Sequence, residues 1–366
     1  MKLFIEPVDV WLFRDGRPFD AGSDHRAASL FPPPPTVMQG AVRSYHLIVA
    51  GVDLRDAIAV RAAVGTAEDY RNLRLRGPFL ARREEDRVRR YLPVPADALL
   101  EEAPATVNRQ TAAPANEKEW QARPLRPEDL SARGILTSAP TPRLLWSEGG
   151  ASKREAGWMD EDAVVKYLKG APAKATPSAV LFKHESRIGL ELDDSRRTAT
   201  EHALYEVQFV RPAKDVGLDL EVEGLEDWPP TGMMQVGGER RAAYYGPSNS
   251  APWPSFREGP DPLPARFKLL LATPACFAQG WQPATWSRFF DGSAELVAAA
   301  LHRYEALGGY DLAKGEHKPS RRYVPAGSVY FFESNGRTRL RSDLLNDALT
   351  DWGAEIGFGQ FLIGSW

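Results

Sequence analysis

The sequence of 366 residues has little material for covalent or metal cross-links, because it contains a single cysteine, Cys276. One cysteine excludes an intrachain disulfide and a cysteine-rich zinc site, and it fits a reducing compartment, so we expect a cytoplasmic protein. No run of about 18 uncharged apolar residues occurs, which excludes a membrane-spanning helix. The first residues include Glu6 and Asp9, so we expect that they do not form a signal peptide.

Recognisable catalytic motifs are also missing. The histidines are scattered, none of them forms an H-x-x-x-H pair, and no G-x-S-x-G sequence occurs. We therefore expect no metal, no cofactor and no enzymatic activity. One alternative stays open, because metal-independent RNA cleavage needs only a histidine, lysine or tyrosine beside the scissile phosphate. His25 and His184 are the candidates for that role.

An excess of positive charge is absent as well, since 46 basic residues face 49 acidic ones and the formal net charge is -3. A free-standing nucleic-acid-binding protein is usually basic, so the overall charge argues against RNA. It does not exclude RNA, because a local basic groove is sufficient for binding.

Proline and glycine are abundant, with 30 residues of each, and they interrupt helices and strands often. Apolar alternation predicts strands and 3.6-residue periodicity predicts helices, in no regular βαβ order. This mixture indicates an α+β fold with mostly antiparallel sheets. The expected strands are 2–13, 73–81, 188–192, 204–210, 218–222, 267–271 and 328–332, and the expected helices are 36–51, 161–168, 294–307 and 344–352.

The length of the chain predicts two domains. Residues 101–177 are rich in proline, alanine and charge, which is typical of an insertion or a loosely packed arm. We place the boundary after this segment. The N-terminal domain is then 1–177, including the insertion, and the C-terminal domain is 178–366.

The first helix has the clearest start in the sequence. Thr36 as the N-cap and Gln39 three residues later give a capping box, and Gly51 ends the helix. Its expected buried stripe is Val37, Ala41, Tyr45 and Ile48.

Polar and basic residues gather around this helix. Gln39, Arg43 and His46 lie on the face opposite the apolar stripe, and the loop before the helix carries further cations. The loop cations are Arg14, Arg17, His25 and Arg26. Cations beside a helix N-terminus suit a phosphate, although a solvated polar helix face explains the same residues.

A β-hairpin is predicted where two alternating segments, 183–192 and 204–210, flank a polar turn. Basic residues stand at its base and its tip: Lys183, His184, Arg187, Arg196 and Arg197. Such a protruding hairpin could wedge between nucleotides. The alternative is an exposed hairpin whose charges keep it soluble.

Two glycine-rich segments complete the candidate site. In the first, Gly237 and Gly238 allow close backbone approach, and Arg240 and Arg241 could grip phosphates. The second lies at the C-terminus and exposes backbone N–H groups that could hold phosphates without sequence preference. Its members are Gly357, Phe358, Gly359 and Gln360.

These segments, in this order, resemble the type III-B (Cmr) CRISPR effector subunit of the RAMP superfamily that binds the 5′ handle of the crRNA. The resemblance rests on motifs at both ends and in the middle of the chain. They are Trp11–Phe19, Phe31–Arg43, His184–Gly189, Gly237–Arg241, Val324–Tyr330 and Gly357–Gly359. Residues 101–177 carry little of it.

The resemblance implies two ferredoxin-like (RRM-like) domains with insertions. It also implies a non-catalytic subunit that caps the crRNA 5′ handle and contacts two proteins, the large polymerase/cyclase-like subunit and the backbone RAMP subunit. In this superfamily the glycine-rich loop and the basic residues near the first helix face RNA. No aromatic RNP-type strand is evident, which argues against base stacking on the sheet face. The alternative function is a metal-independent crRNA-processing endoribonuclease of the same superfamily.

Overall fold

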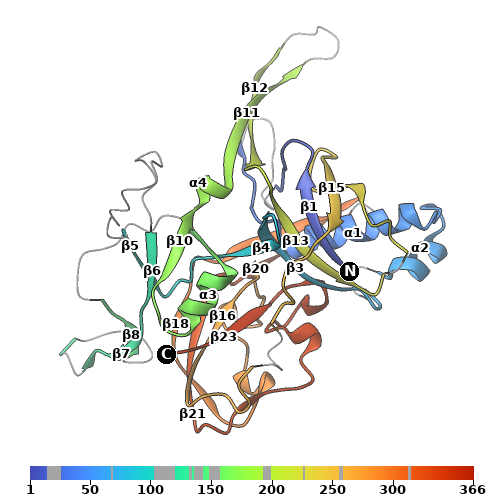
Figure 1. Cartoon of the computed structure of the whole chain (residues 1–366). Helices are drawn as coiled ribbons and strands as arrows, with labels where there is room; N and C mark the ends of the chain where they lie inside the picture. Colours follow the sequence, from blue (N-terminus) through green and yellow to red (C-terminus); the bar gives the residue numbers. More distant parts are fainter. Residues whose placement is uncertain are drawn as a thin grey trace.

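The computed structural model is built around two larger β-sheets, of ten and four strands, and one long hairpin that projects from the body of the molecule (Figure 1). It describes residues 1–14, 26–66, 69–102, 120–131, 134–135, 143–147, 157–192, 199–225, 227–254, 259–311 and 315–366. Within these residues, every helix is too short or too polar to cross a membrane.

The larger sheet has ten strands in the order β14-β15-β1-β13-β3-β4-β9-β10-β6-β5, and its neighbours are all antiparallel. The strands are β1 (Lys2–Pro7), β3 (Arg74–Arg83), β4 (Val88–Pro93), β5 (Ala98–Glu102), β6 (Trp120–Pro124), β9 (Gly157–Asp160), β10 (Ala173–Pro177), β13 (Val216–Glu223), β14 (Gly232–Gln235) and β15 (Ala242–Pro247). Strand β1 ends at Pro7, so the predicted strand 2–13 is too long.

Two helices connect β1 to β3: α1 (Pro35–Val49) and α2 (Ala57–Val64). The predicted capping box is wrong, because the N-cap is Pro34 and no side chain caps the helix. Pro35 supplies the helical φ angle at the first position without needing a hydrogen-bond partner for an N–H. Gly51, at φ 63°, follows the helix end as expected.

The buried face of α1 also differs from the prediction. Met38, Val42 and Leu47 are buried, whereas Ile48 is 67% exposed. The helix is rotated by about one residue from the expected orientation, because it packs onto a core that includes Phe13 and Phe358 from distant parts of the chain.

The smaller sheet has four antiparallel strands in the order β18-β21-β16-β23. They are β16 (Arg266–Leu271), β18 (Ala294–Ala300), β21 (Val329–Ser334) and β23 (Phe361–Ser365). Its core is rich in aromatic rings; Phe267 and Phe332, for example, stack with centroids 5.1 Å apart.

Two predicted helices in this part of the chain are wrong. Residues 294–307 form β18 and the start of β19 (Glu305–Asp311), because pairing with β21 decides the conformation of an alanine-rich run. Residues 344–352 contain only the 3₁₀ turn η4 (Leu345–Asp347), since Asn346 and Asp347 adopt left-handed φ angles of 52° and 53°.

The two sheets share one strand order. The larger sheet contains the neighbouring strands β15-β1-β13-β3, and the smaller sheet is β23-β16-β21-β18. When the four strands of each group are numbered along the chain, both groups have the spatial order 4-1-3-2. Helices link the first two strands only in the larger sheet; the corresponding link in the smaller one contains the 3₁₀ turn η3 (Trp286–Arg288). The expected α+β class with mostly antiparallel pairing is confirmed. The division at residue 177 stays a prediction, and strands from both sides of it lie in the larger sheet.

Part of the predicted insertion 101–177 is packed into the core. Helix α3 (Glu161–Leu168) has the predicted bounds, and Asp160 caps it by accepting a hydrogen bond from the Ala163 N–H. Strands β9 and β10 flank the helix, and Met159 and Tyr167 are fully buried.

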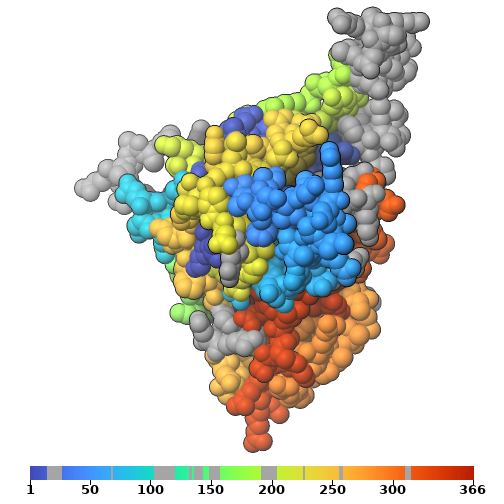
Figure 2. All heavy atoms as spheres, turned by 90° about the vertical axis from the view of Figure 1, so that its right-hand side faces the viewer, coloured from blue at the N-terminus to red at the C-terminus, as the bar shows by residue number. Residues whose placement is uncertain are grey.

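The predicted hairpin is present and longer than expected, with strands β11 (Phe182–Leu192) and β12 (Ala199–Pro212) that rise from the body in Figure 1. The short helix α4 (Ser178–Leu181) leads into it, and β2 (Arg26–Ala27) pairs with β12 near its base. Figure 2 shows the hairpin standing clear of a face covered by α1 and α2, with residues from the C-terminal part directly below these helices.

The remaining elements are short. They are β7 (Pro127–Asp129), β8 (Arg143–Leu145), β17 (Phe290–Asp291), β20 (Glu316–Tyr323), β22 (Arg339–Leu340) and the 3₁₀ turn η5 (Ala354–Ile356). Of these, β20 matters most for the site, because it pairs with β19 in a second hairpin.

Candidate nucleic-acid interface

A cleft of about 1080 Å³ lies where the two sheets meet. One wall comes from β3, β4 and the segment after β4, and the other comes from loops of the smaller sheet, 272–274 and 325–326. The proline segment 32–35 and the base of hairpin β11/β12 close the sides. Most of these residues are apolar, so the cleft suits flat, weakly polar groups such as nucleobases better than free phosphate.

Aromatic rings gather at the hairpin end of the cleft. The ring of Phe182 meets that of Phe31 edge-on at 4.7 Å between centroids, and Trp158 and His184 lie 6.0 and 5.8 Å from Phe182. All four residues line the cleft. Unstacked bases are held by such rings without sequence preference.

Cations stand at the two rims of the cleft. Lys183 and His184, both predicted from the sequence, are exposed at the start of β11. His302 and Arg303 are exposed just before β19 and were not predicted. The sequence does carry a signal for them, because the strand that pairs with β19 contains His317, Lys318, Arg321 and Arg322.

Ion pairs hold the base of hairpin β11/β12 in place. Asp9 accepts hydrogen bonds from Arg211 and Arg187, and Glu185 accepts from the same two guanidiniums. Arg211 first and Arg187 second hold the pKa of both carboxyl groups below their usual range. Arg187 is therefore engaged within the chain, in contacts that set how the hairpin leaves the body.

The double-glycine segment, Gly237 and Gly238, packs closely against the backbone of another part of the same chain. The N–H of Gly238 donates to the Leu12 carbonyl at 2.7 Å, and a Cβ on Gly237, at φ 86°, would lie 2.5 Å from that oxygen. Arg241 lies over the Phe209 ring at 4.8 Å, and Arg187 lies over the same ring at 4.7 Å. The segment and the hairpin base are thus brought together.

Two further predicted cations lie at or near this junction, outside the cleft. Arg240 is exposed beside Arg241, and Arg14 is exposed where its backbone bridges to Ser29. Four other predicted residues lie outside the described residues: Arg17, His25, Arg196 and Arg197.

The polar face of α1 is not brought to the cleft. Gln39 is buried, and Arg43 lies over the Tyr70 ring at 5.7 Å in a separate cavity of about 220 Å³. His46 accepts a hydrogen bond from Trp228, and burial lowers its pKa. The structure therefore does not bring Gln39 and Arg43 to the cleft, and their role in RNA binding stays a prediction.

The C-terminal glycine turn cannot hold phosphates with its amides, because they are already donated. Gly357, Phe358 and Gly359 donate to the carbonyls of residues 354, 353 and 274, and Gln360 donates to Thr273 Oγ1. All four residues are buried. The turn instead supports the wall segment 272–274, since the Thr273 hydroxyl also donates to the Gly357 carbonyl at 2.7 Å.

Replacing Gly357 with alanine is expected to destabilise the fold by about 1–3 kcal/mol, through backbone strain and overlap. The φ angle is 103°, and the added Cβ would lie 2.3 Å from the Gly77 carbonyl oxygen. Urea unfolding measures the change. The matched control is Gly280→Ala, where φ is also positive but nothing lies within 4 Å. Equal losses in both variants would contradict the steric argument.

The whole chain matches one family. The family model described as CRISPR-associated protein (Cas_Cmr3) matches residues 3–366. No curated protein matches the sequence. A chain in the cryo-EM structure of the type III-B Cmr-beta bound to cognate target RNA is similar over 99% of this chain and 96% of that chain, with a TM-score of 0.54 and 14% identity. A chain in the structure with target RNA and AMPPnP, state 1, is similar over 90% and 86%, with a TM-score of 0.52 and 14% identity. These likenesses show a shared fold.

Proposed function

The chain belongs to the CRISPR-associated Cas_Cmr3 family, and from this premise we propose that it binds the 5′ handle of the crRNA in the cleft between its two sheets. The observation that carries the proposal is the composition of the cleft. Cations from two distant segments, Lys183 and Arg303, stand at its rims, while the interior is apolar and partly aromatic. A short single strand fits this arrangement with its phosphates at the rims and its bases inside.

The subunit is proposed to act as a scaffold without turnover, within a type III-B complex in the cytoplasm. Its partners would be the crRNA, the large polymerase/cyclase-like subunit and the backbone RAMP subunit. The net charge of -3 supports this division of surfaces, because only one groove needs to be basic when other faces meet protein. The matched chains come from RNA-bound complexes, which also supports an RNA-associated role.

Hairpin β11/β12 is proposed to separate the handle from the following spacer nucleotides. Ile188, Leu190 and Leu204 lie on one face of the hairpin and are 72%, 55% and 53% exposed. An apolar face on a projecting hairpin can stand between two bases in place of a stacked neighbour. The opposite face packs Val207 and Phe209 onto Val10 and Leu12, which anchors the hairpin.

Two degenerate ferredoxin-like units are proposed to underlie the fold. The support is the shared fourth-first-third-second strand order of β15-β1-β13-β3 and β23-β16-β21-β18. In the smaller sheet, the helical elements of the two links that would carry helices are 3₁₀ turns alone, as far as the described residues go.

The double variant Lys183→Ala/Arg303→Ala is expected to weaken binding of a handle-containing single-stranded RNA by about tenfold for each lost phosphate contact. The slope of log binding constant against log salt concentration should also become shallower, by about 0.7 for each lost phosphate contact. Filter binding over a salt series with the full-length chain measures both. Arg55→Ala is the control, because Arg55 is exposed in the α1–α2 turn and does not line the cleft.

The same mixtures of protein and RNA also test whether RNA binds elsewhere and whether the protein cleaves it. Unchanged affinity and slope in the double variant would show that RNA does not use this cleft. Specific cleavage of the RNA in EDTA, abolished by His25→Ala or His184→Ala, would favour the processing endoribonuclease. Intact RNA with the expected loss of affinity supports the scaffold.

A further inference from the structure

One carboxylate in the cleft has no evident structural purpose. Glu305 is the first residue of β19 and lines the cleft two residues after Arg303. It pairs in register with Tyr323, and it shares a strand face with Leu307. Both of those residues are buried in the main core, so Glu305 is turned inward with them.

This carboxylate is partly buried and unpaired among the described residues. Among the described residues, none forms a hydrogen bond or an ion pair with the Glu305 side chain. Partial burial raises the pKa of its carboxyl group. An acid that lines a cleft and has no partner within the described chain can accept hydrogen bonds from a ligand, so Glu305 is a candidate for ligand recognition.

The chemistry of the group narrows its ligand. An ionised carboxylate only accepts hydrogen bonds, through two oxygens side by side, and it repels phosphate. Guanine presents two neighbouring donors, N1–H and the N2 amino group, on its Watson–Crick edge. Uracil offers one donor between two carbonyl oxygens, and adenine and cytosine each offer an amino group beside an acceptor nitrogen. Only guanine matches both carboxylate oxygens.

Building on the proposed RNA-binding function, we infer that Glu305 reads the Watson–Crick edge of one unstacked guanine held in the cleft. The aromatic and proline side chains of the lining contact the base, and the carboxylate accepts its two donors. The cations at the rims hold the flanking phosphates. The cleft would thereby recognise the base of one nucleotide and bind the neighbouring nucleotides without sequence preference.

Inosine tests this directly, because it is guanine without the N2 amino group. The probes are oligouridine strands of about ten nucleotides that carry one guanine, or one inosine, at each position in turn. The full-length protein is expected to bind the best guanine strand about tenfold more tightly than its inosine counterpart. In Glu305→Gln the two strands should bind equally, because the Gln amide offers one acceptor and one donor. Glu316→Gln, an exposed change on the neighbouring strand β20, should keep the wild-type preference.

The outcomes separate this inference from the proposal on which it rests. If all strands bind and Lys183→Ala/Arg303→Ala weakens them, but guanine and inosine bind alike in the wild type, the guanine reading is overturned and the RNA cleft stands. If the double variant changes nothing, the cleft itself is overturned. If Glu305→Gln raises the melting temperature without altering the guanine preference, Glu305 is only a tolerated, partly buried acid, and the inference fails.

Discussion

Asp97→Ala is expected to lower the free energy of unfolding by about 3–5 kcal/mol, as is usual when one member of a buried ion pair is removed. Lys268 Nζ lies 2.6 Å from Asp97 Oδ2, and the two side chains are 1% and 0% exposed. The Tyr167 hydroxyl donates to Asp97 Oδ1 at 2.7 Å. Without the carboxylate, the Lys268 ammonium would remain buried beside the Tyr167 ring, with no negative partner in the part of the chain that the structure describes.

Urea unfolding of four chains tests this account. Asp97→Ala and Lys268→Met should each destabilise, whereas the double variant should recover much of the loss, because it leaves no lone buried charge. Glu101→Ala is the control, since it removes an exposed carboxylate from the adjacent strand β5. A loss in Asp97→Ala no larger than that in Glu101→Ala would show that the pair contributes little.

The pair also has a consequence for the cleft. Asp97 stands between Ala96 and Ala98, which line one wall, and Lys268 belongs to β16 of the smaller sheet. The Ala96 N–H donates to the Gly327 carbonyl at 2.8 Å, beside the opposite wall. We therefore expect RNA affinity to fall in Asp97→Ala under conditions where the chain is still folded, because the ion pair helps to hold the two walls in register.

Local patterns predicted the elements whose neighbours are close in sequence. Helix α3 has the expected bounds because Asp160 caps it, and hairpin β11/β12 forms because two alternating strands follow one another. Residues 294–307 were misassigned because an alanine-rich run fits helix and strand equally well, and the choice depends on β21, about 30 residues away. The α1 stripe was displaced for a similar reason, since its core partners come from both ends of the chain.

The candidate site was predicted only in part, for a physical reason. Its two rims come from residues 183–184 and 302–303, and only the first pair lies in a recognisable hairpin motif. Glu305 has an ordinary sequence context, and its significance depends on its place in the cleft without a partner among the described residues, which a sequence does not show. Gly357 looked like a phosphate-binding glycine, but its freedom of φ serves close packing against Gly77. A glycine-rich segment indicates that the backbone closely approaches another group. It does not show whether that group is a ligand or another part of the same chain.

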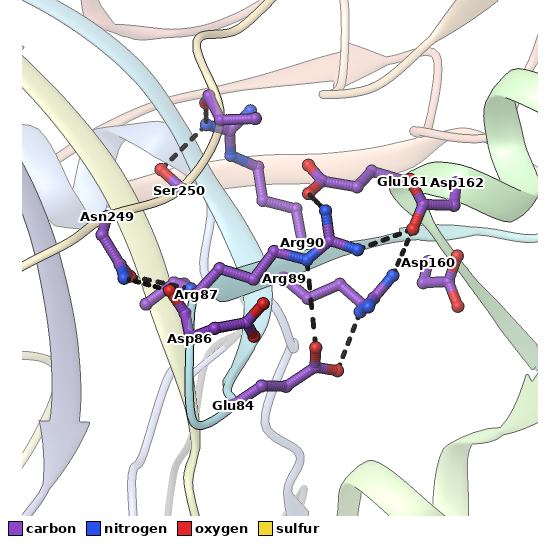
Figure 3. A network of polar contacts seen from close by, with 12 residues as sticks. Glu84, Asp86, Arg87, Arg89, Arg90, Asp160, Glu161, Asp162, Asn249 and Ser250 are labelled. Carbon is purple, nitrogen blue, oxygen red and sulfur yellow. Dashed lines mark hydrogen bonds and ion pairs between the residues drawn. The ribbon is translucent and has the colours of Figure 1, made fainter.

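A second buried ion pair should have an effect as large as the first. Arg90→Met is expected to lower the free energy of unfolding by about 3–5 kcal/mol. Arg90 Nε donates to Asp219 Oδ2 at 2.7 Å, and the two side chains are 2% and 0% exposed. Arg90 also donates to Ser250 Oγ at 2.9 Å (Figure 3). The change would leave the Asp219 carboxylate buried, and among the described residues the Ser248 hydroxyl, at 2.5 Å, would be its one remaining side-chain donor.

The neighbouring residue on β4 provides the control. Arg89 bonds Glu84 and Asp162 in the more exposed network that surrounds Arg90 in Figure 3. Arg89→Met should therefore cost only about 1 kcal/mol or less. Arg90 lies 5.7 Å from the ring of Phe79, a cleft residue, so its loss should also weaken RNA binding, whereas Arg89→Met should not. Equal losses of unfolding free energy in the two variants would contradict the assignment, because the ion pair of Arg90 is buried and those of Arg89 are more exposed.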